Sequence, residues 1–225
     1  DSTGNFHDLG PDRVLSLVEK ELGVQCNNLF RPLNSYINRV FEVETTEGRR
    51  LVVKFYRPGR WTKNALLDEH TFLLELARQE IPVIAPLSFG DGRTLAASDD
   101  LFFAVFPKCG GRSSDEFTDD QWLQIGRLLG RVHQVGETGK AKNRITLAPR
   151  QSTLTQLDYL LGSSCIAEDL KPLLKSTVLR IIEEIEPLFA RSKPIRIHGD
   201  CHFSNIIHRP EESFYLIDFD DMAMG

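Results

Sequence analysis

The spacing of hydrophobic and polar residues divides the chain into a strand-rich first half and a helix-rich second half. In the first half, runs with a period of two, typical of half-buried strands, alternate with two stretches of helical spacing. Glycine or proline marks where these stretches stop, as at Gly23 after the first helix and Pro82 after the second. The pattern predicts, in chain order, a helix over 11–22, strands over 38–45 and 50–56, a helix over 62–79 and short strands near 84–89, 93–97 and 101–106.

The second half begins with a helix whose N-terminus is predicted by a capping motif. Thr118 and Gln121 have the spacing of a capping box, in which the hydroxyl is the N-cap and the amide stands at the third helical position. We expect this helix to run to about Val135. Beyond it the pattern predicts helices near 153–161 and 168–188 and a short alternating strand over 195–198.

Between the halves, residues 107–112 read Pro-Lys-Cys-Gly-Gly-Arg and consist mainly of turn formers. The character of the chain changes at this segment, so we interpret it as an interlobe linker. We therefore predict two units, an N-terminal lobe over residues 1–107 and a C-terminal lobe over residues 108–225.

The stretch that carries most chemistry is His-Gly-Asp-Cys-His-Phe-Ser-Asn over residues 198–205, followed by Asp-Phe-Asp over 218–220. Protein kinases use a similar run, H-R-D-x-x-x-x-N followed by D-F-G, for phosphoryl transfer from ATP. At this spacing Asp200 can orient a hydroxyl group, while Asn205 and Asp218 supply the hard oxygen ligands that Mg²⁺ prefers. Gly199 stands where the protein-kinase run has arginine, and this difference separates the chain from the eukaryotic-type protein kinases.

Two hydrophobic runs, 206–208 and 214–217, flank the turn-like residues 209–213 and predict a β-hairpin. If the hairpin is symmetric about Glu211 and Glu212, positions that sum to 423 face each other. Asn205 would then lie opposite Asp218 at the open end of the hairpin, which would bring the two metal ligands side by side.

Lys54 lies in the apolar run Val-Val-Lys-Phe, where a charge is costly to bury without a partner. We expect it to bind nucleotide phosphates and to be held by Glu69 of the following helix, with Asp68 as the rival partner. The alternative is a lysine on the solvent side of an edge strand; the downstream acids favour the functional interpretation. In the loop 33–40, Ser35 and Asn38 either donate to phosphate oxygens or stabilise a turn by their own hydrogen bonds.

Other residues allow a different chemistry. His198, Asp200 and His202 are residue types that bind zinc in metallohydrolases. A zinc site requires a further ligand, and it leaves Asn205, Asp218 and Lys54 without a role. We therefore prefer a structural role for His198, in which its ring forms hydrogen bonds with the backbone of the loop. For Arg57 and Arg60 we expect a solvated surface position.

Composition narrows the class of protein. The 225 residues are 41% hydrophobic and 26% charged, and the net charge of −5 disfavours nucleic-acid binding. No apolar run has the length of a membrane span, and no signal-like segment opens the chain. The four cysteines are scattered without a C-x-x-C pair, which favours free thiols in a reducing, cytoplasmic setting.

The motifs together resemble a known group. H-G-D-x-x-x-x-N with D-x-D is similar to the aminoglycoside phosphotransferase and choline kinase branch of the protein-kinase-like superfamily. Within that branch, several phrases resemble the bacterial stress response kinase A family: P-L-N-S-Y-I-N-R-V over 32–40, V-V-K-F-Y-R-P over 52–58, Glu69-His70, F-A-V-F-P over 103–107 and H-G-D-C-H over 198–202.

The resemblance implies an α+β, bilobal protein-kinase-like fold, with a small antiparallel-β lobe carrying one helix and a helical lobe. It also implies ATP- and Mg²⁺-dependent phosphorylation of Ser/Thr in proteins. Carried over residue by residue, Asp200 and Asp218 would be catalytic, with Asp200 accepting the hydroxyl proton, and Asn205 and Asp218 would bind Mg²⁺. The implied nucleotide contacts are Ser35 at a phosphate, Lys54 and Glu69 as the phosphate-orienting ion pair, and residues 106–108 as the hinge edge beside adenine.

Family members continue beyond the position of Gly225 with further helices, so we expect the helical lobe of this chain to be C-terminally truncated. The expected acceptor is a protein Ser/Thr in a stress-response pathway, and the expected protein is a cytoplasmic monomer that binds neither nucleic acid nor membrane. One alternative is a kinase of small hydroxylated molecules of the aminoglycoside, choline or homoserine type. The other is a truncated, inactive nucleotide-binding module.

Overall fold

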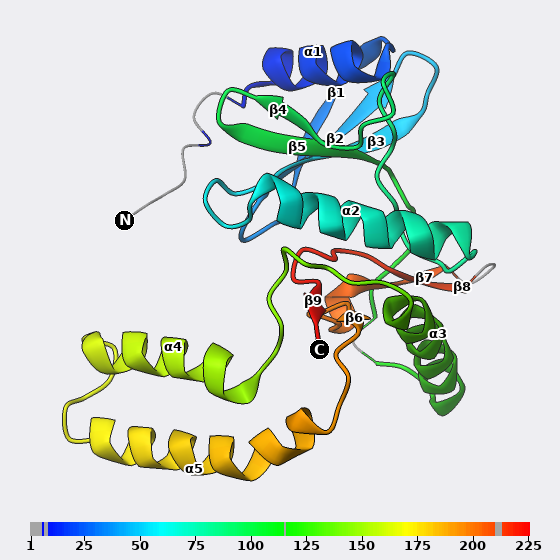
Figure 1. Ribbon diagram of the computed structural model, residues 1–225. Helices are drawn as coiled ribbons and strands as arrows, with labels where there is room; N and C mark the ends of the chain where they lie inside the picture. The colour runs from blue at the N-terminus through cyan, green and yellow to red at the C-terminus, as the bar shows by residue number, and fades with distance from the viewer. Residues whose placement is uncertain (1–5, 7–8, 115, 210–212) are drawn as a thin grey trace.

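The computed structural model describes residues 6, 9–114, 116–209 and 213–225 (Figure 1). Its elements in chain order are α1 (Pro11–Leu22), β1 (Cys26–Leu33), β2 (Arg39–Thr45), β3 (Arg50–Phe55), α2 (Lys63–Arg78), β4 (Ala96–Ser98), β5 (Leu101–Pro107), α3 (Asp119–Glu137), α4 (Pro149–Gly162), α5 (Lys171–Ala190), β6 (Arg196–Ile197), the 3₁₀ turn η1 (Phe203–Asn205), β7 (Ile206–Arg209), β8 (Ser213–Leu216) and β9 (Ala223–Met224).

The first half is built on a five-stranded antiparallel sheet of order β1-β2-β3-β5-β4. Because side chains alternate along a strand, the two faces carry different residues. Val53 and Phe55 of β3 point toward α1 and pack with Val14 and Val18. Lys54, which lies between them in the sequence, therefore points to the opposite face, where α2 lies below the sheet (Figure 1).

Helix ends follow the sequence signals closely. α1 ends at Leu22 and is capped by Gly23 in the left-handed conformation, with φ of 66°. The capping box of α3 is formed in full: the Thr118 side chain accepts from the backbone of Gln121, and the Gln121 side chain accepts from the backbone of Thr118. The predicted helices over 11–22 and 62–79 and the helix after Thr118 are confirmed.

Two strand predictions were less accurate. Residues 84–89, all of which the structure describes, form no strand, and the run near 93–97 is replaced by β4 further along the chain. Pro82 and Pro86 remove two backbone donors, so this segment cannot join a ladder continuously. It is instead held by single contacts such as the Leu87 N–H to the Val105 carbonyl at 2.7 Å.

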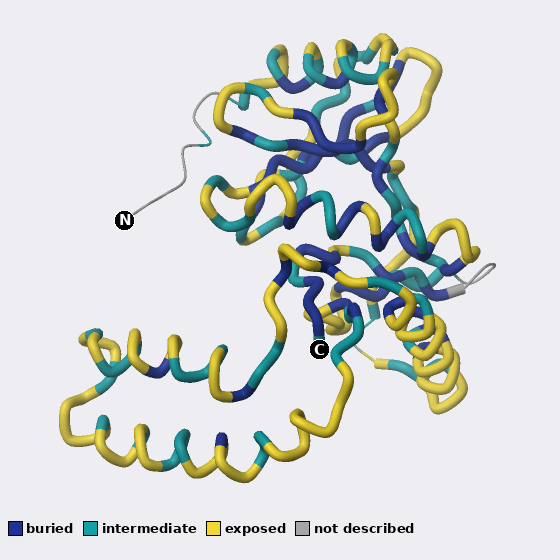
Figure 2. The backbone as a smooth tube through the Cα atoms, viewed as in Figure 1, coloured by how far each residue is buried: buried dark blue, intermediate teal, exposed yellow. Residues whose placement is uncertain are grey.

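In the second half, α4 and α5 pack antiparallel against each other and project away from the sheet and α2 (Figure 1). Most of their surface is exposed (Figure 2), although Leu157 and Ile182 are buried. The very short strands β6 and β9 pair antiparallel, as do β7 and β8, and these two small ribbons carry the motif-bearing loops. The predicted hairpin over 206–217 is confirmed as β7–β8.

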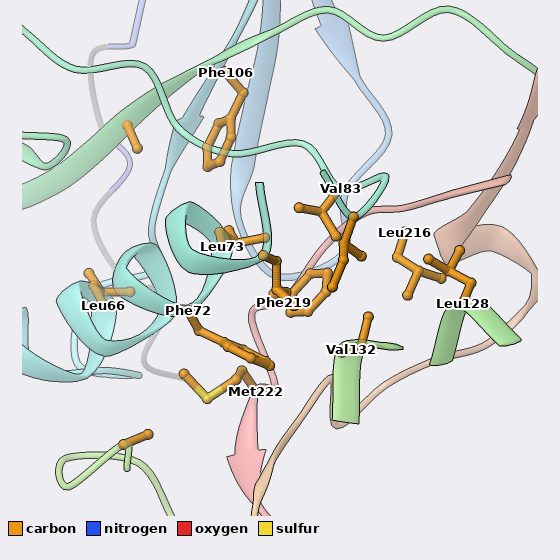
Figure 3. Packing of buried hydrophobic residues seen from close by; sticks show 14 of the residues in the cluster. Leu66, Phe72, Leu73, Val83, Phe106, Leu128, Val132, Leu216, Phe219 and Met222 are labelled. Atoms are coloured by element: carbon orange, nitrogen blue, oxygen red, sulfur yellow. The ribbon is translucent and has the colours of Figure 1, made fainter. Parts of the chain in front are cut away.

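One hydrophobic cluster joins the two halves. Leu66, Phe72 and Leu73 of α2 pack with residues of α3 and with the C-terminal segment, as Figure 3 shows. The rings of Phe72 and Phe219 meet edge to face, with centroids 5.9 Å apart. The sheet, α2, α3 and the motif-bearing segment therefore share a core, while the division at residue 107 stays a prediction. No helix in the described residues has the length and apolar character of a membrane span.

Candidate active site

The loop that follows β6 turns sharply at Gly199. Its φ of 86° lies in the left-handed region, and a Cβ atom built there would lie 1.8 Å from the carbonyl oxygen of Asp221. The backbones of residues 199 and 221 thus approach as closely as glycine allows. This contact explains why glycine replaces the arginine of the protein-kinase run: no side chain fits between the two segments.

His198 fixes the start of the same loop. Its Nε2 atom lies 2.9 Å from the carbonyl oxygen of Ile217, and its Nδ1 accepts the N–H of Asp200 at 3.3 Å. A carbonyl oxygen can only accept, so Nε2 carries the proton and the ring is neutral. Burial lowers the pKa of His198 and favours this neutral form. The structural interpretation of His198 is confirmed.

Asn205 holds Asp200 from the other end of the loop. The Asn205 Nδ2 group donates to the Asp200 carbonyl at 2.8 Å and lies 3.4 Å from a carboxylate oxygen of Asp200. This arrangement uses the amide nitrogen and leaves Oδ1 as the acceptor of the side chain. The carboxylate of Asp200 is 48% exposed, so the acid is positioned by its neighbours but open to an incoming group.

The predicted register of the β7–β8 hairpin was wrong by one residue. Ile206 pairs with Leu216, so facing positions sum to 422 rather than 423. The strands end at Arg209 and resume at Ser213, and an odd number of connecting residues centres the hairpin on one position instead of two. The turn residues 210–212 lie outside the described residues.

The corrected register places the two metal-ligand candidates one position out of register at the open end of the hairpin. The N–H of Ile217 donates to the Asn205 carbonyl at 3.0 Å, so Asp218 follows directly after the residue that faces Asn205. Asp218 has a φ of 60°, a left-handed conformation that non-glycine residues adopt at a cost and that recurs at functional sites. Its carboxylate is half-exposed.

Lys54 reaches this acidic segment from the sheet. Its Nζ atom donates to Asp218 at 2.8 Å and also to Asp220. Burial by itself would lower the pKa of Lys54, but the charges of Asp220 and Asp218 outweigh it and raise the pKa above the ordinary value. Burial likewise opposes ionisation of Asp218, and Lys54 more than compensates, so that the pKa of Asp218 is lowered. Lys54 and Asp218 are therefore both charged at neutral pH.

The expected ion pair between Lys54 and Glu69 is not formed in the described part of the chain. Glu69 is instead paired with Arg144, whose Nη2 lies 2.8 Å from the Glu69 carboxylate. Burial raises the pKa of Glu69 to about 7, with the nearby charge of Asp220 acting in the same direction. The rival partner Asp68 accepts the backbone N–H of Asn143 at 2.8 Å and takes no part in the site.

Arg144 is the residue that sequence reasoning missed. Its guanidinium is buried and donates to the carbonyl of Ala65 at 2.8 Å and to that of Asp220, besides Glu69. The Cζ atom lies 4.2 Å from the centroid of the Trp61 ring, a cation–π contact. A single arginine in a loop belongs to no motif and no periodic run, so the sequence held no signal for it.

Asn38, in the loop between β1 and β2, is buried at the site and is not exposed to solvent. The buried Asn38 side chain donates to Asp220 and accepts the N–H of Arg57 at 3.1 Å. The Ser35 hydroxyl oxygen accepts the N–H of Asn38 at 3.3 Å, a contact of the turn type. Its O–H remains a donor at the tip of the loop.

Arg60 also differs from expectation, because its side chain is 22% exposed and not on a solvated surface. Its Nη2 donates to the Asp221 carboxylate at 2.6 Å, and its Nη1 lies 3.8 Å from a carboxylate oxygen of Asp220. The side chains of Lys54 and Arg60 thus lie beside three aspartates, which are Asp218, Asp220 and Asp221.

Two observations bear on which metal these residues fit. Asn205 Oδ1 and the Asp218 carboxylate are hard oxygen donors, and Mg²⁺ binds through few protein ligands together with substrate phosphates. In the described residues no group of three or more His, Cys, Asp or Glu side chains is arranged to hold a metal ion. The zinc hypothesis lacks its ligand set, whereas the donor chemistry fits Mg²⁺.

A pocket of about 270 Å³ opens beside Gly199 and Asp200. Asp200 lies at its edge, and the remaining wall combines apolar side chains with one acid: Ile145, Leu147, Gly199, Asp221 and Ala223. An acceptor hydroxyl that enters here would meet the Asp200 carboxylate.

Comparison with known proteins shows similarity over the whole chain. Residues 30–225 match the model of the phosphotransferase enzyme family. The chain is 38% identical to the stress response kinase A of Shigella flexneri and of Escherichia coli K12, and in each case it covers 67% of the relative's length. It is 35% identical to the serine/threonine protein kinase RdoA of Salmonella typhimurium, of which it covers 68%.

Solved structures show the same fold at low identity. The microcompartment-associated aminopropanol kinase has a TM-score of 0.74 and 18% identity, over 95% of this chain and 70% of that one. The amicoumacin kinase hAmiN in complex with AMP-PNP, Ca²⁺ and Ami has a TM-score of 0.73 and 20% identity, over 95% and 65%. The chain spans about two thirds of the length of these relatives.

Proposed function

The chain belongs to the phosphotransferase enzyme family and has its protein-kinase-like α+β fold, and we propose that it is an ATP- and Mg²⁺-dependent kinase acting on Ser/Thr of proteins. The observation that carries the proposal is the convergence of Asp200, Asn205, Asp218 and Lys54 from three separate segments of the chain. The kinase names of the relatives support it.

Asn205 and Asp218 are the residues that would hold Mg²⁺. The amide nitrogen of Asn205 is engaged by Asp200, so Oδ1 is the atom of this side chain that can bind a cation, and Asp218 presents a half-exposed carboxylate. When bound, the ion neutralises charge on the transferred phosphoryl group and on the leaving group.

Lys54 would bind the phosphates of ATP. Its ammonium group already lies at the acidic segment, and Ser35 lies in the loop above it, with a hydroxyl able to donate to a phosphate oxygen. The face of the sheet that carries Lys54 also carries Val40, Val52 and Phe106. Val40 pairs with Lys54, Val52 lies two positions before Lys54 in β3, and Phe106 of β5 pairs with Val52. This apolar face, with the edge at residues 106–108, suits adenine.

Asp200 would orient the acceptor hydroxyl and accept its proton. The neutral His198 ring and the Asn205 amide fix the loop on both sides, so the carboxylate is oriented before the acceptor arrives. Its exposed half faces the pocket lined by Ile145 and Leu147, which would exclude water from the side of the acceptor.

A protein acceptor is favoured over a small molecule by the sequence comparisons. The relatives at 35–38% identity are named as stress response kinase A or as a serine/threonine protein kinase. The small-molecule kinases among the solved structures share 20% identity or less and support the fold alone. A cytoplasmic monomer that acts in a stress response completes the proposal.

The test is a pair of substitutions in the two acids. Asp200→Asn should lower phosphoryl transfer to a protein acceptor by about 10²–10⁴-fold and leave Mg-ATP affinity nearly unchanged, because this acid acts on the acceptor. Asp218→Asn should instead weaken Mg-ATP binding in a calorimetric titration. Equal loss of binding and transfer in a folded Asp200→Asn protein would contradict the assignment. Faster transfer to choline, homoserine or an aminoglycoside than to protein would favour the small-molecule alternative.

A further inference from the structure

Asp220 is a buried carboxylate with a shared cation. It is 4% exposed, and its two oxygens bind Lys54 on one side and Asn38 on the other. Lys54 divides its hydrogen bonds between Asp220 and Asp218. In this structure the direct cationic partner of Asp220 is therefore Lys54.

The proposed function removes this compensation. If Lys54 donates to the phosphates of ATP, it has fewer donors for Asp220, while Asn38 supplies only a neutral amide. A buried carboxylate that loses its cation is strongly destabilised, because water cannot replace the lost partner. A second protein cation that approaches Asp220 when the nucleotide binds would offset this loss.

Arg60 is placed for this exchange. Its Nη1 atom is buried and has no hydrogen-bond partner among the residues that the structure describes, an unusual state for a charged donor. That atom lies 3.8 Å from Asp220 Oδ2, too far for a hydrogen bond but close enough to form one after a small rotation. The other arm of the guanidinium is anchored to Asp221 at 2.6 Å, so rotation about this anchor changes the Nη1 distance.

The surroundings of Arg60 hold it close to Asp220. Gly59, in the turn before it, has a φ of 77°, which bends the chain back toward the site. The Trp61 ring packs against Arg60, with Cζ 5.8 Å from the ring centroid, and on the same ring lies Arg144 at 4.2 Å. The guanidinium is thus confined to small movements.

We propose that Arg60 is a positioning residue that takes over the buried carboxylate of Asp220 when Lys54 turns to the nucleotide phosphates. This inference rests on the proposed function for the movement of Lys54. In this proposal the Nη1 N–H of Arg60 donates to Asp220 and keeps its charge compensated. The backbone that carries Asp218 is thereby held in place.

The first test is calorimetric binding of Mg-ATP by the full chain. Arg60→Gln should weaken affinity by at least about tenfold, since the bound state then contains an uncompensated buried charge. Arg60→Lys keeps the charge and should recover part of the loss. The control Lys63→Gln removes an exposed positive charge that is close in the sequence and should change affinity by less than about threefold.

The second test needs no nucleotide. Lys54→Met imitates the departure of the lysine, so Asp220 should already depend on Arg60 in that background. Arg60→Gln should then lower the unfolding temperature more in the Lys54→Met protein than in the wild type. A strictly additive cycle, or an affinity loss with Lys63→Gln as large as with Arg60→Gln, would overturn the inference. A wild type that does not bind Mg-ATP would overturn the proposed function, while the nucleotide-free cycle would still decide whether Arg60 supports Asp220.

Discussion

Single residues at the site are explained by close contacts that the sequence does not display. The H-G-D run could be read from the chain, and it pointed to phosphoryl transfer. Its glycine could only be noted as a departure from the protein-kinase run. The structure supplies the cause, because the backbone of Asp221 occupies the space that a side chain at 199 would need.

Gly199→Ala should therefore unfold or strongly destabilise the protein. The new methyl group would lie against a backbone carbonyl, and the left-handed φ adds strain, so we expect a loss of about 3 kcal/mol or more in the free energy of unfolding. Chemical denaturation measures it. Gly126→Ala is the matched control: it lies in α3 with open space around it, and alanine should stabilise the helix by up to about 1 kcal/mol. Equal effects would refute the steric argument.

The sequence also shows only some of the charged residues that lie at the site. Asp200, Asn205, Asp218 and Lys54 could be assigned to one site because motif spacing and strand burial mark them. Arg60 and Arg144 could not, since an arginine in a loop is usually solvated and its partners lie far away in the sequence. The Lys54–Glu69 pair was mispredicted for the same reason, because nothing in the sequence indicates that Arg144 pairs with Glu69.

Among the elements, α2 is tied to the sheet by a buried chain of polar groups. His70 Nε2 lies 2.9 Å from the Tyr56 hydroxyl, and Nδ1 lies 2.8 Å from the Thr94 hydroxyl. Burial, with the charges of Lys54 and Arg144 adding to it, lowers the pKa of His70 to about 3. The helix is thus held by a neutral imidazole that satisfies both hydroxyl groups.

This arrangement predicts an acid-sensitive fold. The folded protein binds a proton at His70 only near pH 3, whereas the unfolded chain binds it near 6.5. The contribution of His70 to stability is therefore present above pH 6.5 and is lost as the pH falls, by about 1.4 kcal/mol per pH unit at most. Between about pH 6 and pH 5 the free energy of unfolding of His70→Gln should fall by about 1 kcal/mol less than that of the wild type. Parallel curves from urea denaturation would contradict this.

The sequence predicted elements well where a cap or a long period marks them. α1 and α3 were delimited by glycine and by a capping box. β6 and β9 have two residues each, too few to show a period, and pair only because Ile197 and Ala223 meet across the fold. The hairpin register depended on the number of turn residues, and a one-residue error there is enough to misplace Asp218.

For the molecule as a whole, Arg144 joins segments far apart in the sequence. It lies after α3, yet it binds Glu69 and Ala65 of α2 and the carbonyl of Asp220. These contacts bring α2 and the C-terminal segment into one arrangement. Family resemblance was sufficient for the overall fold, whereas such long-range connections required coordinates.

Arg144→Met should cost about 3–5 kcal/mol in the free energy of unfolding, because Glu69 would remain buried without its partner. The double variant Arg144→Met/Glu69→Met should lose less than the single one, since it removes the stranded charge. Arg150→Met is the control: its pair with Glu186, which joins α4 to α5, is exposed, and its loss should change stability far less than Arg144→Met. A double variant less stable than Arg144→Met would contradict the explanation.

The pairing of β6 with β9 has a consequence for how the protein folds. Ile195 and Gly225 exchange two backbone hydrogen bonds of 2.9 and 2.8 Å, which closes the chain between them into a ring containing Asp200, Asn205 and Asp218. The loop-closure entropy of this ring is smaller than that of bringing Lys54 to Asp218 across 164 positions. We therefore expect the acidic part of the site to assemble first during refolding, through local contacts, and Lys54 to join it when the sheet docks.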